Sequence, residues 1–113
     1  MTWGTRATFN PVTLLAAGDI TNSYVLYATF TDYVRLLHFK NGTNQTLDVS
    51  LDGTNLHVRL WPTGFDLYDV STNSIKETGL VFPKETKIYV KYDSVAPTTD
   101  YFWIQSIYAQ GGD

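Results

Sequence analysis

Hydrophobic and polar residues alternate strictly in the segment LDVSLD, residues 47–52. This two-residue period is typical of a β-strand with one buried face and one solvated face. Asp52-Gly53 follows at once and predicts a hairpin, because glycine accepts the positive φ that a tight turn requires. The apolar positions resume in residues 56–60, so we expect the two runs to pair. The core positions predicted for this hairpin are Leu47, Val49, Leu51, Leu56, Val58 and Leu60.

Short strand-like runs of the same kind follow one another along the chain. They cover residues 23–30, 34–39, 65–70, 86–92 and 101–109. Turn residues separate the runs at intervals of roughly 8 to 12 residues, the spacing of an antiparallel sandwich or barrel. The apolar run at 12–20 is too short to decide between a strand and a helical turn. Asn41-Gly42 predicts a type I′ hairpin between its two flanking strands, although the polar residues after it lengthen the loop.

Two of these runs lead to predictions about exposed faces. In residues 65–70, Phe65 and Leu67 share one face, and Tyr68 lies on the other, which we expect to be opposite the core. The run YFWIQSIYA at 101–109 is apolar on both faces. We therefore expect it to be a central strand of a sandwich or to contact a partner.

The chain has 113 residues, of which 43% are hydrophobic, enough for one domain with a modest core. We divide it into an N-terminal arm or edge strand (1–12), a β-sandwich domain (13–110) and a tail (111–113). A formal net charge of −3 argues against nucleic-acid binding, and the absence of cysteine excludes disulfides. We find no signal peptide and no apolar stretch of the roughly 18 residues that a membrane helix needs. Synthesis in a cytoplasm is expected.

No combination of residues indicates catalysis. Asp48 and Asp52 share a strand face, but at 3.3 Å per residue they would lie roughly 13 Å apart, beyond the about 5 to 9.5 Å of a glycosidase pair. We expect them to be solvated or turn-forming. His38 and His57 lack metal-ligand spacing, and the chain has neither a nucleophile elbow nor a phosphate-binding loop. We therefore predict no enzyme activity, catalytic residue, metal or cofactor.

Aromatic residues, which make up 15% of the chain, are the remaining candidates for function. The alternation places several of them opposite the predicted core, where they could stack sugars or bury a protein partner. We favour a protein partner, because a small domain without disulfides gains stability when neighbours cover its strands. The residues predicted to make contacts are Trp3, Phe9, Trp61, Tyr89, Tyr101 and Trp103.

Several short segments also occur in a recognisable order. They are GDITNSY at 18–24, FKNGT at 39–43, VSLDG at 49–53, YDVSTN at 68–73, TKIYVK at 86–91 and the tyrosine-rich strand to Ile107-Tyr108. This order, from N-x-T through V-S-x-D-G to K-I-Y-V-K, resembles small virion proteins of tailed bacteriophages. The resemblance extends over most of the chain, about residues 14–109.

The resemblance implies a jelly-roll or immunoglobulin-like sandwich that is present in many copies as a non-enzymatic part of a virion. Together with the count of strand-like runs, we expect a jelly-roll-like sandwich of about eight strands. Such proteins serve as capsid cement or decoration proteins, or as small adaptors at the head–tail or tail junction. The implied partners are other copies of the chain and coat, portal-proximal or tail proteins, with no nucleic acid and no membrane. The alternative is a carbohydrate-binding β-sandwich module, whose partner would be a glycan.

Overall fold

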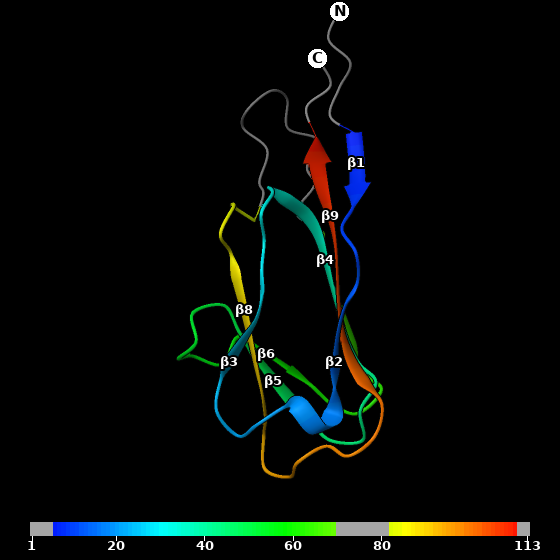
Figure 1. Cartoon of the computed structure of the whole chain (residues 1–113), viewed down its shortest axis with the longest axis vertical. Helices are drawn as coiled ribbons and strands as arrows, with labels where there is room; N and C mark the ends of the chain where they lie inside the picture. The colour runs from blue at the N-terminus through cyan, green and yellow to red at the C-terminus, as the bar shows by residue number, and fades with distance from the viewer. Residues whose placement is uncertain (1–5, 70–81, 111–113) are drawn as a thin grey trace, which may run out of the picture.

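The computed structural model describes residues 6–69 and 82–110, which form two antiparallel β-sheets facing each other (Figure 1). The all-β sandwich predicted from the sequence is confirmed. Nine strands and one short 3-10 turn are assigned in the described part of the chain. They are β1 (Arg6–Phe9), β2 (Thr13–Ala16), η1 (Ala17–Asp19), β3 (Val25–Thr29), β4 (Val34–Asn41), β5 (Leu47–Ser50), β6 (Val58–Leu60), β7 (Phe65–Asp69), β8 (Lys87–Tyr92) and β9 (Tyr101–Gln110).

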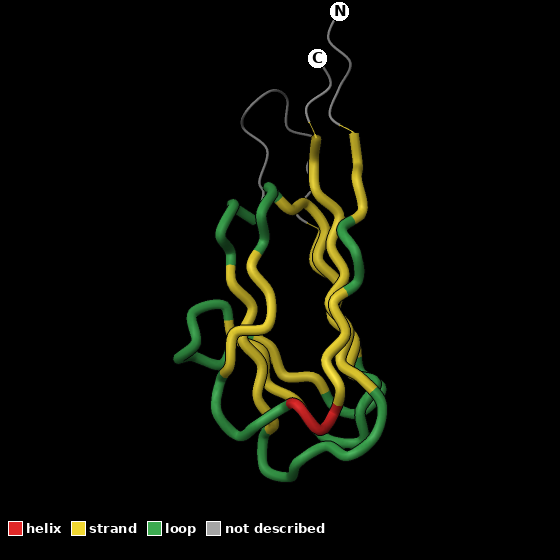
Figure 2. Tube along the Cα trace, viewed as in Figure 1, coloured by secondary structure: helices red, strands yellow, loops and turns green. Residues whose placement is uncertain are grey.

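The two sheets have four strand positions each. Sheet A has the order β1/β2–β9–β4–β7, and sheet B has the order β3–β8–β5–β6. Both β1 and β2 pair with β9, at residues 107–110 and 101–104 respectively, and so share one edge (Figure 2). Pro11 lies between them, and a proline has no N–H to donate to the ladder. The sequence did not decide between a strand and a helical turn for residues 12–20, and the segment contains both, as β2 and η1.

The strand order is that of a jelly roll. β5 pairs with β6, β4 with β7, β3 with β8, and β1/β2 with β9, so each pair encloses the previous one along the chain. The chain therefore folds back on itself at the loop between β5 and β6 and then rolls into two sheets. This topology confirms the jelly-roll-like sandwich that was expected.

The core lies between the sheets and is built from the inward positions of the alternating runs. Phe39 of β4 and Phe102 of β9 stack with ring centroids 5.9 Å apart. From sheet B, Val49 of β5 and Val90 of β8 are fully buried. The complete cluster comprises Leu15, Ile20, Phe30, Val34, Leu37, Phe39, Leu47, Val49, Leu60, Ile88, Val90, Phe102 and Ile104.

The hairpin predicted at Asn41-Gly42 is wrong. β4 ends at Asn41 in sheet A, whereas β5 begins at Leu47 in sheet B, so this connection crosses between the sheets. Among the described glycines, only Gly53 has a positive φ, of 79°. Gly42 instead approaches β9, because its N–H donates to the carbonyl of Tyr101 at 2.9 Å. Its lack of a side chain serves this close backbone contact, since an added Cβ would lie 2.7 Å from the same oxygen.

The side chain of Asn41 holds the crossing in place. It is fully buried, and its Nδ2 donates to the carbonyl oxygens of Gln45 at 2.8 Å and Leu60 at 2.9 Å. Its Oδ1 accepts hydrogen bonds from the backbone N–H and the hydroxyl of Thr43. Asn41 therefore joins the end of sheet A to β6 of sheet B, a role that the Asn-Gly pattern does not reveal.

The hairpin predicted after residue 50 forms, but over a longer loop. β5 pairs with β6, with Val49 opposite Val58. Leu51 and Val58 pack at the margin of the core, as expected. The prediction that Leu56 faces the core is wrong: it lies in the loop that precedes β6 and is 46% exposed.

The predicted orientation of β7, with Tyr68 opposite the core, is wrong. Phe65 and Leu67 point away from the core and are exposed, whereas Tyr68 packs edge-on against Phe39 with centroids 6.1 Å apart. The Tyr68 hydroxyl donates to Asp66 Oδ2 at 3.1 Å. Because β7 is an edge strand, tyrosine can place its ring on the core and its hydroxyl at the polar margin.

Candidate functional site

Three of the aromatic residues predicted to make contacts face outward from sheet A. Tyr101 and Trp103 lie on β9 and are each about half exposed, and Phe9 lies on β1 and is 63% exposed. Their sequence neighbour Phe102 is fully buried on the opposite face. β9 is central in sheet A, as predicted, yet its outer side chains have no described element above them. The structure therefore brings Phe9, Tyr101 and Trp103 onto one surface.

The other predicted contact residues lie elsewhere. Trp61 is 65% exposed and follows β6 in a turn closed by the Gly64 N–H, which donates to the Trp61 carbonyl at 2.8 Å. Tyr89 lies on β8 of sheet B, half-buried against Gly53. Trp3 lies outside the described residues. The six predicted residues thus do not form a single patch.

Three aliphatic and aromatic residues on the same surface of sheet A were missed by the sequence analysis. Leu14 on β2 and Phe65 and Leu67 on β7 are 53%, 62% and 55% exposed. Their period shows two faces for each strand but does not show which one is buried. Together with the β9 and β1 residues they form a surface that we call the apolar face. The apolar face consists of Phe9, Leu14, Phe65, Leu67, Tyr101 and Trp103.

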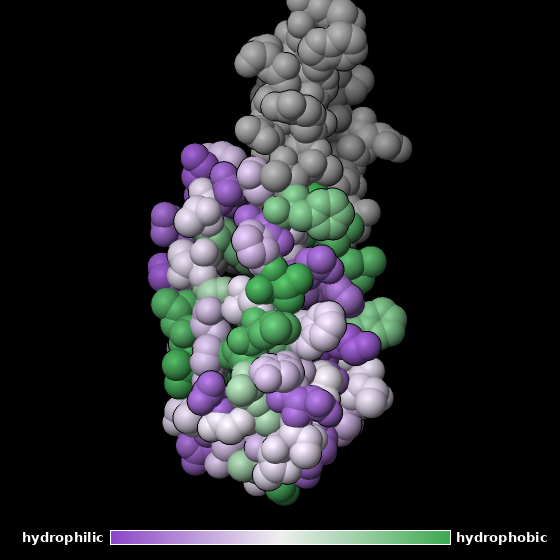
Figure 3. Space-filling view, turned by 45° about the vertical axis from the view of Figure 1, so that its right-hand side comes forward, coloured by the Kyte–Doolittle hydropathy of each residue, from purple (hydrophilic) through white to green (hydrophobic). Residues whose placement is uncertain are grey.

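Figure 3 turns the sheet A side of the molecule partly toward the viewer, and hydrophobic side chains are visible there. They appear as green patches between purple polar residues. An antiparallel sheet whose outer side is solvated normally carries polar residues there. The outer side of sheet A departs from that pattern.

The strand register arranges the outer side of sheet A in rows. In the first row, Trp103 of β9 pairs with Leu14 of β2 on one side and with Lys40 of β4 on the other. Lys40 in turn pairs with Phe65 of β7. A single cation therefore lies between two exposed aromatic residues.

The next two rows continue the surface along the strands. In the middle row, Gln105 pairs with His38, and His38 pairs with Leu67. In the third row, Ile107 of β9 pairs with Leu36 of β4 and, at the edge, with Phe9. Leu36 also pairs with Asp69 of β7. The middle row of the two central strands is therefore polar, the first row combines apolar residues with Lys40, and the third row is apolar except at β7.

His38 also contacts the first row. Its ring meets that of Phe65 edge-on, with centroids 5.8 Å apart and an interplanar angle of 80°. His38 therefore packs against β7 on the outer side of sheet A.

The outer side of sheet B has a different chemistry, built around Asp48. This side chain is only 2% exposed and accepts two hydrogen bonds from Arg59 of β6, from Nε at 2.8 Å and Nη2 at 3.2 Å. Lys91 of β8 places its Nζ 3.5 Å from Asp48 Oδ2. Arg59 also donates to Asp93 at 3.2 Å. The prediction that Asp48 is solvated is wrong, because two cations from neighbouring strands cover it.

Asp48 affects the pKa of two residues near it, Arg59 and Tyr24. The hydrogen bond and the negative charge of Asp48 raise the pKa of Arg59. The Lys91 ammonium lies 5.3 Å from the centroid of the Tyr24 ring. Burial raises the pKa of Tyr24, and the charge of Asp48 adds to the effect. Asp48, Arg59 and Lys91 therefore form a network of opposite charges within one chain.

Asp52 is turn-forming, as predicted. Its Oδ1 accepts hydrogen bonds from the backbone N–H groups of Thr54 and Asn55, both at 2.8 Å. These backbone hydrogen bonds hold the pKa of Asp52 well below its usual range. His57 closes the same loop, because its Nδ1 accepts from the Leu51 N–H at 2.9 Å. Both side chains therefore hold the backbone of this loop.

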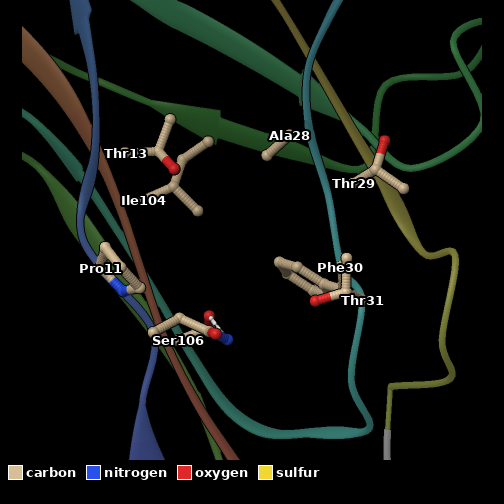
Figure 4. A pocket seen from close by; sticks show the side chains of 9 residues that line it. Pro11, Thr13, Ala28, Thr29, Phe30, Thr31, Ile104 and Ser106 are labelled. Carbon is tan, nitrogen blue, oxygen red and sulfur yellow. Dashed lines mark hydrogen bonds between the residues drawn. The ribbon is translucent and has the colours of Figure 1, made fainter.

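A cleft of about 270 Å³ opens between the edge strands of the two sheets (Figure 4). Its sides come from the β1–β2 segment and from β3, and its floor includes Phe30 and Ile104. Asn10 Nδ2 donates to Ser106 Oγ at 2.8 Å across one wall. The other polar groups are threonine hydroxyls, so the lining carries no charge. The lining residues are Asn10, Pro11, Thr13, Ala28, Thr29, Phe30, Thr31, Ile104 and Ser106.

Within residues 6–69 and 82–110, no helix is long and apolar enough to cross a membrane. In the same ranges, no group of three or more His, Cys, Asp or Glu side chains is placed to hold a metal ion. No protein-family model, curated protein or solved structure matches the chain. Its function is therefore argued from the surfaces themselves.

Proposed function

We propose that this protein is a non-enzymatic structural subunit of a bacteriophage particle. It acts as a multi-copy cement or decoration protein or as a small head–tail or tail adaptor, and the apolar face is its main contact surface. The observation that supports this proposal is the exposure of large apolar side chains across a whole sheet. Phe65, Leu67 and Tyr101 are the three most exposed residues of this surface on β7 and β9.

The size of the apolar face fits a protein contact. Large side chains offer about 150–250 Å² each, so six that are half exposed present on the order of 600 Å². A standard interface buries roughly 800 Å² per partner. Exposed apolar patches of several hundred Å² on soluble domains usually mark such interfaces.

The fold and the predicted copy number are consistent with this role. Jelly rolls occur in viral capsid proteins, but also in lectins and other domains, so the fold supports the proposal only by analogy. On a particle, many copies bind side by side, and avidity strengthens contacts that are weak in isolation. The sequence resemblance to small virion proteins points in the same direction.

The cleft between the sheets favours the carbohydrate-binding alternative. Its hydroxyl and amide groups over an apolar floor are chemistry that suits a neutral sugar. However, Phe30 in the floor is only 6% exposed and offers no ring face for stacking. The well-exposed aromatic rings lie on the outer side of sheet A instead. We therefore place assembly ahead of sugar binding.

The proposal is tested by asking whether the chain is part of a particle. Particles purified by density gradient from lysates of cells that carry the gene should contain the chain in many copies, measured by quantitative mass spectrometry. Leu67→Glu on the apolar face should reduce incorporation at least tenfold, whereas Leu56→Glu, at an equally exposed leucine outside it, should not. A chain that stays in the soluble fraction and binds a glycan array would support the alternative and overturn assembly.

A further inference from the structure

We infer that the apolar face binds the same face of a second copy of this chain, in a symmetric dimer. The two-fold axis runs parallel to the strands, between β4 and β9. This inference rests on the proposed function, because it takes the apolar face as the contact surface. It adds the identity of one partner and the register of the contact.

The axis follows from how rows and strands behave under two-fold rotation. An axis parallel to the strands reverses the order of strands across the sheet but keeps each row at the same level. β9 of one copy then lies over β4 of its partner, and the β2 edge lies over β7. Each outward residue therefore lies over a residue of the partner in the same row. That residue is on the strand at the same distance from the axis but on its other side.

In the first row, this arrangement places Trp103 over the partner's Lys40. An ammonium over an indole ring is a favourable cation–π pair, and it strengthens when water is excluded. The contact occurs twice, since Lys40 meets the partner's Trp103 in return. The one cation of the row is thereby covered by an aromatic ring and is not buried against aliphatic groups.

In the middle row, His38 lies over the partner's Gln105. The imidazole and the amide each have a donor and an acceptor, so they can form a hydrogen bond in either orientation. Both residues are half-buried already and need such a partner if water is removed. The polar middle of the surface is thus self-complementary.

Two of the remaining contacts are apolar on both sides, whereas Phe9 at the β1 edge of the third row lies over the position of the partner's Asp69 on β7. Leu36 lies over the partner's Ile107 in the third row, and Leu14 lies over the partner's Phe65 at the edge of the first row. An axis perpendicular to the strands would instead place the first row over the third. Lys40 would then lie over the partner's Leu36 and would have no aromatic ring above it, so no cation–π contact would offset its desolvation.

The exposed area is also sufficient for two copies. The six residues of the apolar face offer on the order of 600 Å². The half-buried residues of the middle and third rows extend this toward the roughly 800 Å² per partner of a stable interface. Sheets that pack face to face lie about 10 Å apart and within about 30° of alignment, so rows stay opposite each other near the axis.

Light scattering after size-exclusion chromatography tests the dimer, with two leucines as a matched pair. Leu14 on β2 and Leu26 on β3 are both outward-facing leucines on edge strands, 53% and 44% exposed, but on different sheets. We expect the wild-type chain to be a dimer at micromolar concentration. Leu14→Glu should raise its dissociation constant at least tenfold, and Leu26→Glu should leave it unchanged. A wild-type chain that is monomeric at 100 micromolar, a test concentration of order 10⁻⁴ M, overturns the inference.

A charge-swap variant tests the register. Within one copy, Leu14 and Phe65 are separated by β9 and β4, or roughly 14 Å at about 4.8 Å per strand. A Glu and a Lys at these positions cannot pair within a copy, but they can pair across the proposed axis. Leu14→Glu and Phe65→Lys should each weaken the dimer, and the double variant should recover at least part of the loss. No recovery in a double variant that is folded by circular dichroism overturns the register.

Folding and function can be separated from dimerisation in this design. If Leu14→Glu does not fold, Phe65→Thr replaces it, because threonine favours strands and removes the apolar contact. A monomeric chain that still enters particles overturns the dimer and leaves the structural role intact. A dimeric chain that is absent from particles overturns the structural role and leaves the dimer intact.

Discussion

The outer sides of the two sheets carry different kinds of side chains. Sheet B covers its outer side with charges that neutralise one another, since Asp48 is held by Arg59 and Lys91 from both neighbouring strands. Sheet A has no such network among its described residues and exposes Trp103, Phe65 and their neighbours. The first surface satisfies its charges within one chain, whereas the second leaves large apolar side chains exposed, and we propose that a partner covers them.

The two surfaces should contribute differently to the stability of the isolated domain and to the proposed association. A buried carboxylate with two cationic partners gives little net stability but makes the loss of one partner costly. An exposed apolar side contributes nothing to the isolated domain and contributes fully on association. Changes on sheet B should therefore affect unfolding, and changes on sheet A should affect assembly.

The largest expected effect comes from removing Asp48. Asp48→Ala leaves Arg59 and Lys91 facing each other without the carboxylate, and it should lower the free energy of unfolding by about 3 kcal/mol. We expect the low end of the range for buried pairs, because the Arg59 side chain is 38% exposed and stays partly hydrated. Urea denaturation monitored by tryptophan fluorescence gives the measurement.

Asp93 supplies the matched control for that experiment. It accepts a hydrogen bond from the same Arg59 at 3.2 Å, but its side chain is 38% exposed. Asp93→Ala should change the free energy of unfolding by less than about 0.5 kcal/mol, as for most surface ion pairs. If both variants lost the same free energy of unfolding, the burial of Asp48 would not explain its contribution. The proposed difference between the outer sides of sheets A and B would then be contradicted.

The fold was predictable because alternation alone places most core residues. Val49 and Val90 lie in runs with a two-residue period, and both are fully buried in strands. Turn spacing then favoured an antiparallel sandwich. What the period could not give was the sheet to which each strand belongs. Asn41-Gly42 has the composition of a hairpin but crosses between sheets, because the buried Asn41 amide bonds to β6.

The candidate site was predictable only in part. Tyr101 and Trp103 were expected to be exposed and are, because β9 is apolar on both faces and only one can face the core. Phe65 was missed, since a strand with Phe and Leu on one face and Tyr on the other can be buried either way. The choice depends on Tyr68, which reaches the core from an edge strand and keeps its hydroxyl at the margin. That information lies in the tertiary structure.

A smaller effect is expected from the loop that covers sheet B at Tyr89. Gly53 has a φ of 79°, and an added Cβ would lie 3.2 Å from the Tyr89 ring. Gly53→Ala should therefore lower the free energy of unfolding by about 1–2 kcal/mol, the cost of the left-handed conformation for a residue with a side chain. Gly18→Ala is the control, because a Cβ added there would meet no atom within 4 Å and its φ is not in that region. Thermal unfolding of both variants should separate them, and equal melting temperatures would contradict the strained-turn explanation.

The smallest effect is a pH dependence that belongs to the same loop. Backbone hydrogen bonds from Asn55 and Thr54 hold the pKa of Asp52 well below its ordinary value of 3.8. A carboxylate with a depressed pKa in the folded state stabilises the fold fully above its unfolded pKa, and the contribution decreases as the pH falls below it. Asp52→Asn keeps an acceptor oxygen for the loop but does not titrate. The urea midpoint of the wild-type chain should therefore fall more between pH 5 and pH 2.5, on either side of an ordinary aspartate pKa of about 3.9, than that of the variant. Parallel curves for the two proteins would show that Asp52 does not stabilise the loop over Tyr89, and that sheet B relies on the Asp48 network alone.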